Sequence, residues 1–425
     1  MSKARAYGAD AVLLAVPEVT YGVAPASGYA GLDFKSCTLS SEQPLGDDPL
    51  LGRGRNAQDP YRGLVTDEGE IEIPIDRQGI GFWLTALFGD PTTTTVKATG
   101  YIDFSAQPAA DSTITLNGTT WTFKTSGATG AQTNIGVDLD ATITALASNL
   151  NASADTQVAK CTYTANTTDD RLEIEFDTAG TTGNAWLLVA SAASNGTVSY
   201  AHLTGGGYSH VWESGSESIP SYTIEVGHPA LTAPVFFRHV GCVMESLAFN
   251  MGQEGPANAT IVVVAQGEES AAATIDGTPD RYTLQRYSNG RGFVRRDGSL
   301  LGNITSGSFT FSNNLERVRV IRDDGKIEAA DPTLATCNGT MTVRYDGAGL
   351  EVPAASGDPI VLQYGFTTVD GWSLTFDLPR VLLPKAKAGI AGPGGVEVSY
   401  DWRAAYDSDT DKMLTVTLIT DVASY

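Results

Sequence analysis

Residues 68–90 read EGEIEIPIDRQGIGFWLTALFGD, and this stretch decides the fold because its hydrophobic period changes halfway along. From Glu68 to Pro74 acidic and apolar residues alternate, which is the two-residue period of a half-buried strand. From Ile80 to Phe88 apolar residues recur at helical spacing, and Gly89 followed by Pro91 is a stop signal. We expect one strand and then one helix, with an apolar helix face packed against a sheet.

The composition changes directly after this helix. Residues 92–207 are rich in Thr, Ala, Gly and Asn, and β-patterned sequence resumes after Gly205-Gly206-Gly207. Insertions are tolerated at exposed loop tips, where few backbone contacts are disturbed. We therefore predict a discontinuous host domain formed by residues 1–91 and 208–425, with an inserted domain between them.

The inserted block has the local signals of a small α+β domain. Asn117-Gly118 accepts the positive φ angles of a tight hairpin turn. Residues 138–152 predict a helix with Asp138 or Asp140 as its N-cap. Further strands are expected over residues 159–165, 171–177 and 186–190.

The second part of the host predicts many short strands. Several alternate cleanly between apolar and polar residues, as at Leu247, Phe249 and Met251. Such strands, separated by turn signals, favour a sandwich or barrel over a parallel α/β sheet. The candidates are residues 222–226, 236–244, 246–251, 259–265, 308–311, 340–345, 360–363, 373–378, 396–402 and 413–419.

Residues 1–66 contain few periodic segments and many Pro and Gly breakers. A stretch of this length without its own core is usually an arm, a lid or disordered. We expect an arm that orders on a neighbouring subunit.

Charge, cysteine usage and hydropathy exclude several classes of protein. The 425 residues include 27 Lys plus Arg and 49 Asp plus Glu, so the net charge of −22 argues against tight nucleic-acid binding. The four cysteines have no CxxC spacing, and we expect free, mostly buried thiols suited to a reducing cytoplasm. Residues 1–10 lack the apolar stretch of a signal peptide, and no run of about 18 apolar residues predicts a membrane span.

Motifs for catalysis and metal binding are missing from the sequence. It contains no Walker-type loop, GxSxG or HExxH, and its four histidines are isolated from one another. Asp407, Asp409 and Asp411 imitate a calcium loop, but Lys412 and Leu418 replace its required glycine and bidentate glutamate. We interpret this segment as an acidic hairpin turn and predict no enzyme, no cofactor and no metal site.

Two basic clusters occur in this acidic chain. Arg291, Arg295 and Arg296 form the denser cluster, and residues 317–322 contain three more arginines. They allow contacts to phosphates, salt bridges to a neighbouring copy, or a solvated face. Because complementary patches set the register between subunits, we favour the first cluster as an inter-subunit contact.

Four segments in this order resemble the tail tube proteins of long-tailed bacteriophages. The likeness covers residues 40–90 and 208–425. The segments are LGRGR at residues 51–55 with EGEI at 68–71 and the helix 82–89; IPSYTIE at 219–225 with FRHVGCVMESL at 237–247, like the family's strand pair; residues 374–383; and the closing strand 413–420.

The resemblance implies a mainly β fold: a tail-tube β-sandwich or barrel with one flanking helix, here carrying a small inserted α+β domain. It implies homohexameric rings, assembled in the host cytoplasm, that stack into the virion tail tube through which DNA is ejected. The implied partners are further copies, the tail terminator and distal tail proteins, the tape measure protein and, transiently, phage DNA. The inserted domain should lie outside the tube, since in every copy of a ring it would obstruct a central channel.

In such proteins a long loop reaches the adjacent ring, and the breaker-rich segment 46–66 matches it. The resemblance thus indicates a candidate inter-ring stacking loop. Its charged residues are Asp47, Asp48, Arg53, Arg55, Asp59 and Arg62.

Two functions of other classes stay open. The Thr/Asn-rich insertion allows a carbohydrate-binding adhesin or virion decoration protein, although no aromatic cluster that could stack on a sugar is visible in the sequence. A glycan-degrading enzyme rests only on abundant carboxylates, none of which can be paired from the sequence.

Overall fold

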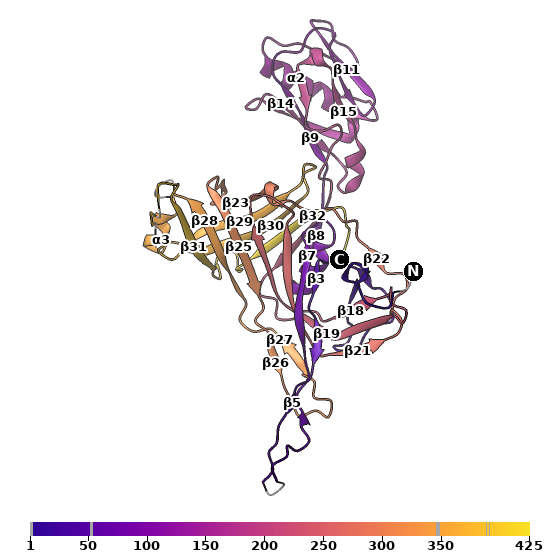
Figure 1. Ribbon diagram of the computed structural model, residues 1–425. Coiled ribbons are helices and arrows are strands. Elements are labelled where there is room, and N and C mark those ends of the chain that lie inside the picture. Colours follow the sequence, from indigo (N-terminus) through magenta and orange to yellow (C-terminus); the bar gives the residue numbers. More distant parts are fainter. Residues whose placement is uncertain (1–2, 52–53, 346–348, 388, 391) are drawn as a thin grey trace.

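The computed structural model describes residues 3–51, 54–345, 349–387, 389–390 and 392–425. The fold is mainly β, as predicted, and most host strands are hydrogen-bonded into one 20-stranded sheet that folds over on itself. An inserted lobe and a thin hairpin extend from opposite ends of this body (Figure 1).

Two layers of the large sheet face each other as a sandwich, and we call these layers the first sheet and the second sheet. The first sheet contains, in spatial order, β7 (Thr66–Pro74), β20 (Asn258–Ala265), β19 (Val235–Met251), β25 (Ile304–Ser312), β28 (Thr336–Arg344) and β31 (Glu397–Ala404). The second sheet contains β24 (Ser299–Leu300), β23 (Gly292–Arg296), β29 (Ile360–Thr367), β30 (Ser373–Leu382), β32 (Thr415–Thr420), β17 (Gly207–Glu213) and β8 (Thr92–Val96). The layers join at one corner, where β30 pairs with β31.

Aromatic side chains from both sheets fill the space between them. The rings of Phe249 and Phe309 stack with centroids 4.9 Å apart, and Phe376 from the second sheet lies 4.9 Å from Phe309. The rings of Tyr364 and Trp402 are 5.6 Å apart. Each large aromatic side chain buries about 150–250 Å² of surface, so this cluster accounts for much of the stability of the sandwich.

A smaller third layer lies beside the sandwich. It is formed by β2 (Ala30–Gly31), β1 (Val12–Pro17), β18 (Tyr222–His228), the first half of β19, β21 (Gly267–Ala271) and β22 (Asp280–Arg281). Further short host elements are β26 (Glu316–Val318), β27 (Ala329–Asp331) and α3 (Glu351–Ser356).

The expectation of two separate strands at residues 236–244 and 246–251 is wrong. Strand β19 is one strand, Val235–Met251, whose first half pairs with β18 and β21 and whose second half pairs with β20 and β25. The register shifts between Met244 and Ser246, and Gly241 has a φ of +63°. A β-bulge therefore interrupts the alternation and redirects the strand from one layer into the other without ending it.

Helix α1 spans Ile80–Phe88, as predicted, and ends at Gly89 with a φ of +92°. Its apolar residues pack against a sheet, as expected, but burial is not confined to one face, because every one of its residues is buried. The helix packs on β17 and β19 and is covered by the C-terminal residues, with the ring of Tyr425 against Gly81. It is thus part of the core of the host.

The expectation of an N-terminal arm is wrong for much of residues 1–66. Strand β1 pairs with β18 through six residue pairs and has four buried residues. The short strands β3 (Ser36–Cys37) and β4 (Ser40–Glu42) lie along β7. These contacts join distant parts of the chain, which a local pattern cannot predict.

The carboxylate of Glu18 fixes the end of β1. It accepts four hydrogen bonds of 2.8 Å: two from the hydroxyls of Ser221 and Thr223, and two from the backbone N–H groups of Gly22 and Gly241. One side chain therefore holds β1, β18 and the bend of β19 together.

Residues 97–206 form the inserted lobe. Its two four-stranded sheets are β12 (Gln132–Asn134), β11 (Thr119–Lys124), β10 (Thr113–Leu116) and β15 (Leu188–Ala190), and β13 (Cys161–Asn166), β14 (Arg171–Phe176), β9 (Thr99–Phe104) and β16 (Gly196–Val198). Helix α2 (Leu139–Asn151) is capped by Asp138, whose side chain accepts a 2.8 Å hydrogen bond from the N–H of Ala141. The lobe has its own hydrophobic core, which includes Trp121 and Leu146.

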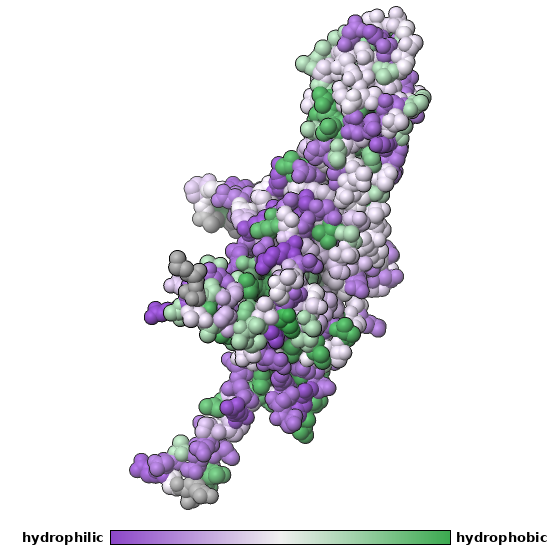
Figure 2. Space-filling view, turned by 90° about the vertical axis from the view of Figure 1, so that its right-hand side faces the viewer, coloured by the Kyte–Doolittle hydropathy of each residue, from purple (hydrophilic) through white to green (hydrophobic). Residues whose placement is uncertain are grey.

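The chain enters and leaves the lobe through neighbouring strands. Val96 at the end of β8 pairs with Gly207 at the start of β17. Because β8 belongs to the second sheet, the lobe begins at residue 97, five residues after the composition changes. The space-filling view shows the lobe and the hairpin at the two ends of an elongated molecule (Figure 2).

Candidate assembly surfaces

The first sheet has a polar outward face. Strand pairing places one row of side chains across all six strands: Glu72, Thr260, Ala248, Thr310, Asn338 and Arg403. Their neighbours along the strands, such as Ile71 and Phe309, are buried in the sandwich. The alternation thus separates an aromatic inner face from a hydroxyl- and amide-rich outer face.

Carboxylates gather at one side of this face. Glu68, Glu70 and Glu72 point outward from β7, as the alternation predicts. Glu68 lies 2.7 Å from the guanidinium of Arg317, and Glu72 pairs with Lys35. Within the described parts of the chain Glu70 has no ion-pair partner, so this edge of the sheet carries a negative charge.

The two edges of the first sheet are unequal. Strand β31 pairs with β28 from Glu397 to Arg403, but its other side meets β30 only at Arg403 and Ala404. In the residues that the structure describes, the rest of that side has no strand partner. At the opposite edge, β3 and β4 cover only part of β7. Open sheet edges are templates for pairing with another chain.

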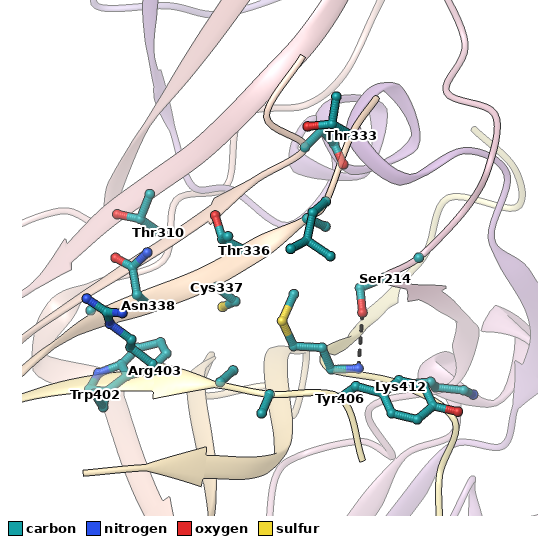
Figure 3. Close-up of a pocket in the computed structure, with 18 of the residues that line it drawn as sticks. Ser214, Thr310, Thr333, Thr336, Cys337, Asn338, Trp402, Arg403, Tyr406 and Lys412 are labelled. Atoms are coloured by element: carbon teal, nitrogen blue, oxygen red, sulfur yellow. Dashed lines mark hydrogen bonds between the residues drawn. The ribbon is translucent and has the colours of Figure 1, made fainter. Parts of the chain in front are cut away.

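A groove of about 1170 Å³ lies over the outward face of β25, β28 and β31, and its lining includes Thr310, Asn338 and Arg403 (Figure 3). It is lined by the loops 214–217, 332–335 and 404–406 and by polar residues of β25, β28 and β31. Ser214 Oγ accepts hydrogen bonds from the N–H groups of Met413 (3.3 Å) and Leu414 (3.0 Å). Burial raises the pKa of the Cys337 thiol well above its usual value, so it is a poor nucleophile there.

The groove has the character of a contact surface. Many of its side-chain hydrogen bonds involve hydroxyls, as between Ser308 and Thr340 at 2.9 Å. The hydroxyl of Tyr406 donates a 2.8 Å hydrogen bond to Asp411, and this carboxylate raises the pKa of the hydroxyl, which makes it a poor nucleophile.

The predicted stacking-loop residues lie on the projecting hairpin, whose base is formed by β5 (Leu45–Gly46) and β6 (Tyr61–Arg62). Asp47, Asp48, Arg55, Asp59 and Arg62 are exposed, and in the described residues none of them forms an ion pair. Arg53 lies outside the described residues.

The hairpin also carries exposed apolar side chains, which were not among the predicted residues. Leu51 is 99% exposed, and Leu45, Leu50 and Tyr61 are also more than half exposed. The ring of Tyr61 lies across Gly46, where an added Cβ would be 2.5 Å from it. The two consecutive leucines, Leu50 and Leu51, lie between proline and glycine in the sequence and could have indicated these exposed side chains. Exposed apolar residues at the tip of a projection indicate a contact with another molecule.

The first arginine cluster is assembled at one edge of the second sheet. Arg295 donates a 3.1 Å hydrogen bond to Gln363, and its guanidinium lies 4.5 Å from the centre of the Phe293 ring. Arg296 pairs with Asp297 at 3.0 Å. Arg291, in the turn before β23, has no ion-pair partner in the described residues. The cluster is thus partly engaged within its own chain.

The second arginine cluster is engaged by carboxylates of the same chain. Arg317 contacts Glu68 and Glu245, and Arg322 contacts Asp324 and Glu328. These two arginines therefore have intramolecular partners.

Histidines and aspartates of the host have structural partners. Nδ1 of the buried His239 lies 2.9 Å from Oδ1 of Asp67. The ring of His210 contacts Thr93 and the carbonyl of Val422, and burial lowers its pKa. Asp407 accepts hydrogen bonds from both the N–H and the hydroxyl of Thr410, which closes the acidic turn.

Among the described residues, no group of three or more His, Cys, Asp or Glu side chains is placed to hold a metal ion. In the same residues, no helix has the length and hydropathy to cross a membrane. The four cysteines are free, and three are buried, as predicted.

Comparison with known families agrees with this architecture. A family model described as "Phage tail tube protein" matches residues 8–404. A search of curated proteins found no match. The family implies self-assembly into a tube with other tail components and a place in the virion tail, and it suggests a structural, non-enzymatic protein. Because the match covers nearly the whole chain, the protein belongs to the phage tail tube protein family.

Proposed function

We propose that this chain forms homohexameric rings that stack head to tail into the tail tube, the conduit through which DNA is ejected into the host. The observation that carries the proposal is the polar, partly acidic outward face of the first sheet next to an open sheet edge. Stacking is then a heterologous contact, which generates an open filament.

The outward face of the first sheet suits the wall of the channel. DNA must slide along this wall without being held, so the wall needs hydration and little positive charge. The face presents Ser, Thr and Asn side chains with the carboxylate of Glu70, and the whole chain has a net charge of −22. Arg403 is the single arginine in the row of side chains across this face, and one positive charge per copy is too weak to retain a DNA duplex.

Ring closure uses the sheet edges. The free side of β31 in one copy pairs with the β3–β7 edge of the next, so that the first sheets form one continuous barrel around the ring. This pairing satisfies backbone N–H and C=O groups that an isolated copy exposes. The arginines 291, 295 and 296 lie on the second sheet and supply salt bridges to acidic surface of the neighbouring copy.

Stacking uses the projecting hairpin. Leu50 and Leu51 bury apolar surface against the adjacent ring, and the charged residues 47, 48, 53, 55, 59 and 62 set its register. The tail terminator and distal tail proteins contact the ends of the stack, and the tape measure protein occupies the channel before DNA. The inserted lobe lies on the outside of the tube.

Native mass spectrometry of the purified chain, before any tube grows, tests the ring. We expect a six-copy species as the main oligomer. A different closed number of copies refutes the hexamer, and a persistent monomer refutes ring formation.

A further inference from the structure

The inserted lobe carries a second groove, about 440 Å³ in volume, on the outer face of its β13–β14–β9 sheet. Strand pairing places two rows of side chains along it. Thr162, Glu175 and Thr99 form one row, and Thr164, Glu173 and Tyr101 form the other. Ser199, Tyr200 and Thr204 form the wall at its side. Residues directly opposite each other share one face of a sheet, so the six side chains of the two rows lie on the face that bears the groove.

Two tyrosines from distant parts of the sequence meet in this groove. Ser199 Oγ accepts a 3.0 Å hydrogen bond from the N–H of Tyr101, and the N–H of Ser199 donates to the carbonyl of Tyr101 at 2.9 Å. These bonds hold Ser199 against Tyr101, and the next residue, Tyr200, lines the same groove. The two tyrosines lie on different segments of the lobe, so the sequence does not show that they line one groove.

The ring of Tyr101 is held in place. The guanidinium of Arg171 lies 3.8 Å from its centre, and Arg171 is itself fixed by a 2.6 Å contact with Asp103. A side chain that is ordered before a ligand arrives loses less entropy on binding. Arg171 covers one face of the ring, so the opposite face and the hydroxyl are what the groove can offer.

Two carboxylates supply hydrogen-bond acceptors. Oε1 of Glu173 accepts from the side-chain amide of Asn166 at 2.9 Å, and Oε1 of Glu175 contacts Lys97 at 2.7 Å. Both glutamates are exposed, and within the described residues neither has a partner on its second oxygen. Each can therefore accept hydrogen bonds from a ligand while its orientation is held by its present partner.

We propose that this groove binds a neutral carbohydrate. Sugar rings present C–H faces that pack on tyrosine and hydroxyl groups that donate to carboxylates and exchange hydrogen bonds with Thr and Ser. Glu173 and Glu175 disfavour phosphorylated, sulfated or other anionic ligands by like-charge repulsion. This inference does not depend on tube formation.

Affinity electrophoresis of the full-length protein tests the proposal, with dextran, mannan and laminarin as neutral probes and dextran sulfate as the anionic one. We expect at least one neutral polysaccharide to slow migration. Tyr200→Ala and Glu173→Gln should each weaken that binding about tenfold or more, since each removes a central contact. The control Leu187→Ala removes an exposed apolar side chain of the lobe outside the groove and should bind like the parent.

Circular dichroism melting curves identify variants that fail to fold, and Thr164→Ala is a second, milder probe of the same row. The proposal is overturned if none of the three neutral polysaccharides binds, or if only dextran sulfate does. It is equally overturned if the groove variants bind like the parent, or if Leu187→Ala loses as much affinity as Tyr200→Ala. Rings and tubes by microscopy are a separate readout, so failure here leaves the tube proposal intact.

Discussion

The ring of Tyr425 lies directly on Gly81 of helix α1, where a Cβ added to the glycine would be 2.2 Å from the nearest ring carbon. The glycine therefore leaves the space that the last aromatic residue fills. Tyr425 also contacts the rings of His210 and Tyr282, so it closes the core over the buried helix.

Gly81→Ala should destabilise the chain despite the better helix propensity of alanine. Overpacking costs about 1–3 kcal/mol, and the overlap of the added Cβ with the Tyr425 ring places this change in the upper part of that range, at about 2–3 kcal/mol. The gain in helix propensity offsets about 1 kcal/mol, so we expect a net loss of roughly 1–2 kcal/mol. Urea unfolding measures this change. Gly252→Ala, where an added Cβ meets nothing within 4 Å, is the control. An unchanged or higher unfolding midpoint for Gly81→Ala would mean that Tyr425 does not occupy this space.

Glu18→Ala should be among the most damaging single changes outside the sandwich core. It leaves two backbone N–H groups and two hydroxyls without their acceptor, and unsatisfied buried groups cost about 1–3 kcal/mol each when water cannot replace the partner. We expect a loss of more than about 2 kcal/mol in the free energy of unfolding. The matched control is Glu254→Ala at an exposed turn. Equal effects of the two changes would contradict the role given to Glu18.

The buried thiols should resist alkylation in the folded chain. Burial, with a smaller effect of Asp177, raises the pKa of Cys161 to about 12, and burial raises the pKa values of Cys242 and Cys337 as well. We expect mass spectrometry after iodoacetamide at pH 8 to find no adduct on these three cysteines, and adducts on all four in urea. Rapid labelling of Cys161 in the folded chain would refute its burial.

The raised pKa of Cys161 predicts that the free energy of unfolding depends on pH. The folded-state pKa of Cys161 lies above the unfolded-state value of about 8.5, so its contribution is complete below that pH and is lost as the pH rises towards 12. Cys161→Ala should flatten the alkaline decline of the unfolding midpoint between about pH 9 and 12. A decline of the same slope in both proteins would assign it to other groups.

Replacement of Leu50 and Leu51 by serine should separate ring formation from ring stacking. Both side chains are exposed in the single chain, so its melting temperature should stay unchanged, while the apolar contact with the next ring is lost. Sedimentation velocity should show rings without long tubes. Val137→Ser, an equally exposed apolar position on the lobe, should assemble normally. Tubes of normal length in the double variant would exclude the hairpin tip from stacking.

The sequence predicted the elements whose signals are local. The ends of α1 and α2 follow from Gly89 and from the side chain of Asp138, and the hairpin at Asn117-Gly118 has the positive φ angles that its residues favour. The stability of helix caps and tight turns depends on a few neighbouring residues, so these features can be predicted from a single sequence.

Contacts between distant residues were not predictable in the same way. The bulge of β19 resembles a strand end until its pairing with two layers is known, and β1 acquires its place from β18 and Glu18. The same distinction between local signals and distant contacts applies to the candidate functional residues. The projecting segment 46–66 was indicated by its breakers and by the family resemblance, whereas the groove lined by Tyr101 and Tyr200 depends on the pairing of β9 with β14 and on the bonds between Ser199 and Tyr101.

Electron microscopy of the purified chain tests the central claim most directly, with a second sample in which residues 97–206 are replaced by a short Gly-Ser linker. We predict rings and stacked tubes with a central channel in both samples, and peripheral density that disappears when the lobe is deleted. Monomers in both samples, or lobe density inside the channel, would contradict the account.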